Sequence, residues 1–205
     1  MLELFLSAFV TLFVVIDPPG CAPIYASMTT GASKAEFRAM AIRATVIAGV
    51  ILLIFALFGE ALLGALHIGL DSFRIAGGIM LFLIALEMVF ERRHERREER
   101  AEKVIARAAP DVSVFPMAMP MLAGPGSIAT IMLLVARAEG VDEDLAVLGA
   151  LAAVLLLALI ALLAARPLMR LLGERIEAVV TRLLGVLLAA LAVQFVIDGL
   201  RGSFA

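Results

Sequence analysis

Residues 145–165 read LAVLGALAAVLLLALIALLAA, a run of 21 residues without one charged side chain. A helix of about 20 mostly apolar residues crosses a hydrocarbon core about 30 Å thick, so this run is typical of a transmembrane helix. The rest of the chain is similar, because 63% of its 205 residues are hydrophobic and only 18% are charged. A soluble domain carries about 25% charged residues. The composition therefore excludes an ordinary soluble enzyme.

Five more apolar runs lie on either side of this one, which predicts six transmembrane helices. The predicted spans are approximately Leu4–Met28, Ala39–Leu63, Ser72–Phe90, Val112–Ala136, Leu145–Ala165 and Val179–Asp198. The predicted fold is an all-α polytopic membrane protein with one membrane domain, residues 1–205. Its N-terminus lacks the positive charge of a signal peptide, so we expect the first span to be retained.

The basic residues indicate the orientation of these spans. Of 17 lysine and arginine residues, 14 fall on one side of the predicted membrane. Because the side rich in lysine and arginine stays in the cytoplasm, we expect a multi-pass protein of a prokaryotic inner membrane with both termini outside, in the periplasm. The charged residues 91–111 are then a cytoplasmic loop between a first half, 1–90, and a second half, 112–205.

The composition also limits partners and cofactors. Basic residues lie in short connections and not on one face, so nucleic acid is not an expected partner, whereas the lipid bilayer is. One cysteine and two histidines are too few for structural zinc, and we expect no metal site and no cofactor.

The two halves resemble each other. Asp17-Pro18-Pro19-Gly20-Cys21 matches Ala123-Gly124-Pro125-Gly126-Ser127 at a separation of 106 residues, and Arg74-Ile75-Ala76-Gly77 matches Arg182-Leu183-Leu184-Gly185 at 108. Two matches at nearly one separation suggest a duplication. Each half holds three spans, an odd number, so the second copy must enter the membrane from the opposite face. The sequence therefore predicts two inverted three-helix repeats.

Prolines interrupt the first and fourth spans. They are Pro18, Pro19 and Pro23 in the first half and Pro116, Pro120 and Pro125 in the second. Because proline removes a backbone donor and clashes with the preceding turn, we expect both helices to break. At about 1.5 Å per residue, both breaks fall near the middle of the membrane. Paired interruptions in inverted repeats point to the binding site of a secondary transporter.

A half-helix that begins at such a break directs free N–H groups and a positive dipole end at the midplane, which favours a carboxylate ligand. We expect Gly124, Gly126 and the Ser127 hydroxyl to bind the carboxylate of a compact substrate. Asp17 would bind its ammonium group or carry a coupling ion, H⁺ or Na⁺. Two structural interpretations stay open: Asp17 before Pro18 is a good helix N-cap, and the small residues at 124–127 suit tight helix packing.

Five other polar residues lie in or near the spans, and three of them are candidate gating residues: Arg74, Arg182 and Gln194. Arg74 and Arg182 open the third helix of each half, as interfacial anchors or as members of a gating ion pair. Gln194 lies inside the last span, where it cross-links helices or lines a path. Glu87 and Asp198 are close to span ends and are predicted to be interfacial.

Four segments carry a resemblance to the MarC family of multipass membrane proteins. They are Ile16–Gly20 with Pro23, Phe73–Ile79, Pro120–Thr130 and Ala192–Phe195. The resemblance implies a six-span inner-membrane protein and, from some family members, transport of small neutral amino acids such as glycine and alanine. The family often has isoleucine where Pro19 stands. The resulting candidate substrate- or ion-binding residues are Asp17, Pro18, Gly20, Gly124, Gly126, Ser127 and Thr130.

Three other functions remain as alternatives to an ion-coupled transporter. A passive channel can also be built from facing broken helices. A non-transporting partner of a membrane complex is compatible with the same sequence; assembly as a homo-oligomer is compatible with any of these functions. An intramembrane serine hydrolase needs a base beside Ser127, whereas His67 and His94 fall in predicted loops, so we expect no enzyme activity.

Overall fold

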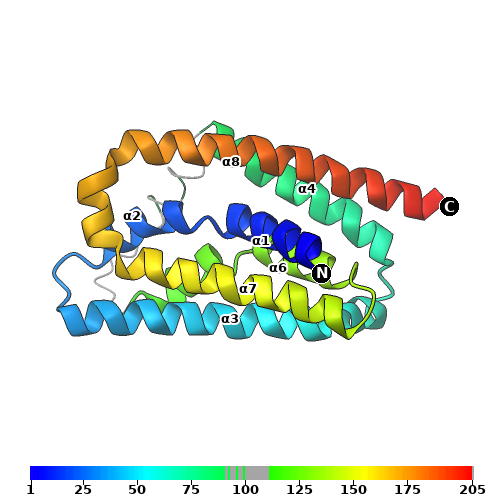
Figure 1. The fold of residues 1–205 in the computed structure, drawn as a ribbon, viewed down its shortest axis with the longest axis horizontal. Coiled ribbons are helices and arrows are strands. Elements are labelled where there is room, and N and C mark those ends of the chain that lie inside the picture. The colour runs from blue at the N-terminus through cyan, green and yellow to red at the C-terminus, as the bar shows by residue number, and fades with distance from the viewer. Residues whose placement is uncertain (91, 93–95, 97–98, 100–110, 205) are drawn as a thin grey trace.

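The computed structural model describes residues 1–90, 92, 96, 99 and 111–204, without the side chains of 168–178. Within these residues every regular element is a helix (Figure 1). Five helices are long and apolar enough to cross a membrane, and the bent pair Ser113–Leu122 and Pro125–Val135 adds a sixth span if it is counted as one. The prediction of an all-helical polytopic membrane protein is confirmed.

The first span breaks at a single residue, Asp17, between α1 (Leu2–Ile16) and α2 (Pro18–Met28). Asp17 has φ 57° and ψ 65°, a left-handed conformation that ends α1, while its amide still donates to the Phe13 carbonyl at 2.9 Å. The break that we expected at Pro23 is absent, since Pro23 lies within α2. A proline costs one intrahelical hydrogen bond there without ending the helix.

The fourth span is more irregular. It consists of η1 (Ser113–Leu122) and α6 (Pro125–Val135), which meet at an angle of 53°. Phe115 and Met119 have extended backbone inside η1. Each precedes a proline, whose ring disfavours helical geometry in the residue before it. The predicted interruption of this span is therefore present, and α6 starts afresh after Gly124.

Four long helices complete the fold: α3 (Lys34–Ala65), α4 (Leu70–Val89), α7 (Val141–Leu163) and α8 (Ala165–Phe204). A capping box between Ser33 and Glu36 starts α3. The sequence placed a connection before a helix at Val179, but α8 already begins at Ala165 and turns near its start (Figure 1). The predicted loop 91–111 lies mostly outside the described residues.

The helices pack in two groups (Figure 1). In the first, α3 and α7 lie antiparallel, α1 and α2 pack on α7, and η1 and α6 pack on α3. In the second, α4 packs along α8, and both touch the first group through α6, α1 and α2. The chain ends lie at the same end of the molecule, opposite the α2–α3 turn.

Glycines bring α4 and α8 together. A Cβ on Gly78 would lie 2.7 Å from the Ala192 carbonyl oxygen, and a Cβ on Gly185 would lie 3.1 Å from that of Ala85. Small residues at these positions let two helix backbones approach closely, which is how helices gain packing energy in a membrane.

Asp111 ties the start of η1 to α3. It forms an ion pair with Arg43, and it accepts the Ser113 amide at 2.8 Å. Hydrogen bonds from Ser113 hold the pKa of Asp111 below its usual value, with a smaller contribution from the positive charge of Arg43.

Candidate functional site

A cavity of about 310 Å³ lies where α6 begins, between α4, η1 and the end of α1. Most of its wall is apolar, and the polar exceptions are Glu87, Arg96 and the backbone and hydroxyl groups of the α6 start. The lining residues are Val15, Met80, Leu83, Ile84, Glu87, Arg96, Pro120, Met121, Gly124, Pro125, Gly126 and Ser127. The predicted open helix end and a ligand-sized space therefore coincide.

The start of α6 has no side-chain cap. Gly124 is the N-cap residue, and its carbonyl accepts the Ile128 amide at 3.0 Å. Pro125 has no N–H, so the amides of Gly126 and Ser127 are the donors left over in this first turn. They lie at the positive end of an 11-residue helix, where an anionic group is favoured.

Two glycines shape this start. A Cβ on Gly124 would lie 2.4 Å from the Pro120 carbonyl oxygen, which leaves no room for a side chain. A Cβ on Gly126 would lie 2.5 Å from Ile84 Cδ1 and 3.5 Å from Val15 Cγ1. Gly126 thus keeps the end of α1 and the wall of α4 close to the α6 amides.

The two hydroxyl residues of α6 differ in position. Ser127 is 3% exposed and lines the cavity, and its hydroxyl takes no part in the hydrogen bonds among the described residues. Thr130 is fully buried and does not line the cavity, and its Oγ1 has no hydrogen-bond partner within the described structure. Of the two, Ser127 is the side chain that can bind a ligand in this cavity.

The helix start at the first break has a side-chain cap, whereas the helix start at the second break has none. Asp17 is 1% exposed, and its Oδ1 accepts the Gly20 amide at 3.1 Å, so the carboxylate caps α2. A Cβ on Gly20 would lie 2.3 Å from Asp17 Oδ2, which explains the glycine. Asp17, Pro18 and Gly20 are buried and do not line the cavity. The cap interpretation is confirmed, while an ion-binding role for Asp17 stays a prediction.

Glu87 is a cavity residue that the sequence analysis placed at the interface. It lies on α4 three residues after Ile84, the residue that contacts Gly126, and it pairs with Arg96. Its side chain is 28% exposed, against 62% for Arg96. The sequence signal was an acid inside the apolar run 72–90, but nothing in the sequence placed it in the same cavity wall as residue 126.

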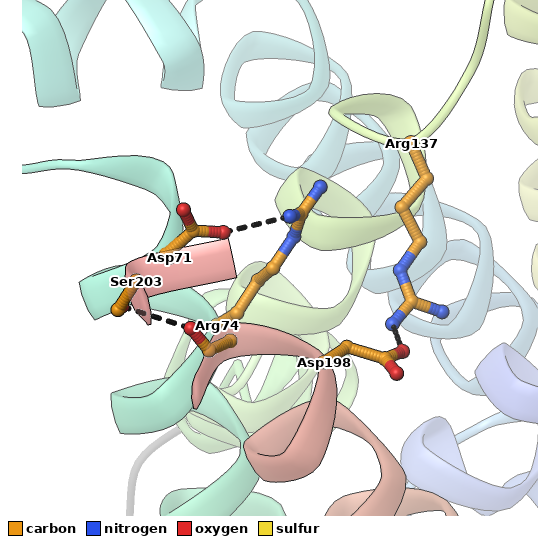
Figure 2. Close-up of polar contacts among 6 residues, drawn as sticks. Asp71, Arg74, Arg137, Asp198 and Ser203 are labelled. Atoms are coloured by element: carbon orange, nitrogen blue, oxygen red, sulfur yellow. Dashed lines mark hydrogen bonds and ion pairs between the residues drawn. The ribbon is translucent and has the colours of Figure 1, made fainter. Parts of the chain in front are cut away.

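The candidate gating residues do not meet one another. Figure 2 shows Arg74 bound to Asp71 of its own helix, at 2.8 Å, and Arg137 paired with Asp198. Gln194 Nε2 donates to Asp198 at 2.7 Å, and Arg137 lies 4.5 Å from the centre of the Phe195 ring. Arg182 is exposed on α8. Gln194 therefore joins a network that links the end of α6 to α8, outside the cavity.

These features define an integral membrane protein in which one interrupted span starts a half-helix inside a cavity. The chain belongs to the MarC family, since the model of the MarC family integral membrane proteins matches residues 2–204.

Similar proteins occur in archaea and bacteria. A UPF0056 membrane protein of Methanocaldococcus jannaschii is 36% identical over 202 residues, 98% of each chain. UPF0056 membrane protein YvbG of Bacillus subtilis is 34% identical and covers all of this chain and 97% of its own length. UPF0056 membrane protein YhcE of Escherichia coli is 32% identical over 96% of this chain and 91% of its own. No solved structure matches.

Proposed function

We propose that this protein is a secondary transporter that moves small neutral amino acids, such as glycine and alanine, across the inner membrane. The observation that carries the proposal is the uncapped start of α6 in the wall of a mostly apolar cavity. The amides of Gly126 and Ser127 and the Ser127 hydroxyl can together bind a carboxylate. Polar groups gathered at one point of an apolar cavity are typical of a site for a small ligand.

The size of the substrate follows from the walls. Val15 of α1 and Ile84 of α4 lie close to Gly126. The large side chains of Met80, Leu83 and Met121 form further parts of the cavity wall. A methyl side chain or a hydrogen suits such a space better than a long or charged side chain, because the wall is mostly apolar and its two charged residues, Glu87 and Arg96, already pair with each other. Glycine and alanine fit these limits.

The proposal includes alternating access through two inverted repeats, and correspondences between the two halves support it. Both α2 and α6 have 11 residues, α6 begins 107 residues after α2, and α7 begins 107 residues after α3. In this correspondence η1 matches α1, α6 matches α2, and α7 matches α3. The contacts of α1 and α2 with α7 then correspond to the contacts of η1 and α6 with α3, and both sets are present.

The contact between α4 and α8 shows the same correspondence between the two halves. Shifting the pair Gly78 and Ala192 by 107 residues between halves produces the pair Ala85 and Gly185, which also lie in contact. A transporter with two halves related in this way has one conformation open to one side of the membrane. When the two halves exchange their conformations, the protein becomes open to the other side.

Coupling to an ion belongs to the proposal through Asp17. An intramembrane acid is costly unless it has a function or a partner, and Asp17 lies where α1 and α2 would have to hinge. The Asp17→Asn substitution removes the charge and keeps an N-cap that tolerates the left-handed conformation. We expect this variant to retain exchange of alanine but to lose uptake driven by a H⁺ or Na⁺ gradient.

The test of transport is counterflow of labelled alanine and glycine in proteoliposomes. We expect saturable counterflow by the native protein and its loss in Gly126→Leu, which fills the cavity. Gly64→Leu is the matched control, because a Cβ on Gly64 meets nothing within 4 Å. Flux without saturation or counterflow would instead indicate a channel. The absence of flux, with the native protein correctly inserted, would favour a non-transporting membrane partner.

A further inference from the structure

The cavity at the α6 start contains both charges that an amino-acid ligand would need to meet. The α6 amides form its positive end, and Glu87 is the carboxylate in its wall. Glu87 already has an ion-pair partner in the described structure, because Arg96 also lines the cavity and pairs with it. One cation therefore already occupies the carboxylate of a site that is open at its anion-binding end.

The placement of Glu87 suits a ligand bound at Gly126. Ile84 and Leu81 of α4 both face Gly126, at 2.5 Å and 3.7 Å from the position of its Cβ. Residues three apart on a helix lie on one face, so Glu87 continues the row Leu81–Ile84 by one further turn. Glu87 therefore lines the same cavity as the α6 start, one helical turn further along α4.

We propose that Glu87 recognises the ammonium group of the substrate, and that Arg96 takes the place of this ammonium group when the site is empty. The inference rests on the proposed function and assigns its specificity: the ligand is a zwitterion, held at its carboxylate by α6 and at its ammonium by α4. Binding then replaces the Glu87–Arg96 ion pair by a Glu87–ammonium pair. A carboxylate without an amino group cannot make this exchange.

The two members of the ion pair have opposite roles in this scheme. Glu87→Gln removes the acceptor of the ammonium, so we expect the alanine concentration for half-maximal counterflow to rise roughly tenfold or more. Arg96→Gln removes the competing cation, so we expect that concentration to fall by about two- to fivefold. An ion pair with a purely structural role would shift both variants in the same direction.

The experiment measures the concentration dependence of alanine counterflow in proteoliposomes for the native protein, Glu87→Gln, Glu87→Asp and Arg96→Gln. Arg38→Gln and Asp142→Asn are the controls, because these exposed residues change charge without lining this cavity. Propionate, which lacks the amino group of alanine, is added as a competitor. We expect little competition with the native protein and a smaller preference for alanine over propionate in Glu87→Gln, with partial recovery in Glu87→Asp.

The outcomes separate the two proposals. If the native protein shows no counterflow, the transport proposal fails and the assignment of Glu87 fails with it. If the native protein is active but Glu87→Gln and Arg96→Gln change the half-maximal concentration in the same direction, or leave it unchanged, the role of Glu87 is wrong and the transport proposal stands. If Glu87→Gln does not fold, the direction of the Arg96→Gln effect decides.

Discussion

Asp17 combines a left-handed backbone with a capping carboxylate, and both features limit what can replace it. Asparagine is a comparable N-cap and also adopts this backbone region, whereas alanine does neither. We expect Asp17→Ala to lower the free energy of unfolding by about 1–3 kcal/mol and Asp17→Asn by less than about 1 kcal/mol.

Thermal unfolding in detergent checks this order. Asp142→Ala, an exposed acid in the first turn of α7, is the control and should change stability little. Equal losses for Asp17→Ala and Asp17→Asn would show that the negative charge, and not the cap, stabilises the break.

Local sequence predicted part of this site and missed another part. Asp17 followed by Pro18, and Gly124 followed by Pro125, are signals carried by neighbouring residues, so both helix starts could be expected. The contact of Ile84 with Gly126 joins residues that are far apart in the chain, and Glu87 lines the cavity together with both of them. A rule about span ends placed Glu87 near the interface but gave no sign that it lines this cavity.

At the scale of helices, the tight α4–α8 pair rests on glycines whose Cβ positions meet backbone. A Cβ on Gly78 would contact the Ala192 carbonyl and the Val196 amide at 2.7 Å and 3.0 Å. Backbone atoms cannot move aside as a side-chain end can, so we expect Gly78→Val to cost about 1–3 kcal/mol through overpacking.

Unfolding in detergent again supplies the measurement, with Gly64→Val on α3 as the control for the helix propensity of valine. A Cβ on Gly64 would meet nothing within 4 Å, so we expect its substitution to leave the midpoint of the unfolding transition almost unchanged. A Gly78→Val variant as stable as Gly64→Val would mean that α4 and α8 do not pack as described.

The long apolar runs located the helices well, because a run long enough to span a bilayer is a strong local signal. It did not show that α8 begins at Ala165, since charged residues after this position look like a loop when their packing is unknown. Nor did it show that Pro23 stays inside α2, because the cost of one proline depends on the contacts that hold the remaining turns.

At the scale of the whole molecule, both termini share one end and the α2–α3 turn lies at the other (Figure 1). The bias of basic residues predicts that the end with the termini faces the periplasm. In a Cys21→Ala background, we expect Ser203→Cys to react in intact cells with a membrane-impermeant thiol reagent, and Thr30→Cys to react only after permeabilisation. The reverse pattern would invert the orientation and leave the fold unchanged.

The most direct test of the account is protection of the cavity by its substrate. In the Cys21→Ala background, Met80→Cys places a thiol in the cavity wall, and Leu157→Cys places one on α7 outside it; both native side chains are 37% exposed. We predict that alanine slows the reaction of a small methanethiosulfonate with Met80→Cys several-fold and leaves Leu157→Cys unaffected. Equal Met80→Cys rates with and without alanine, at concentrations that saturate counterflow, would contradict a substrate site at the start of α6.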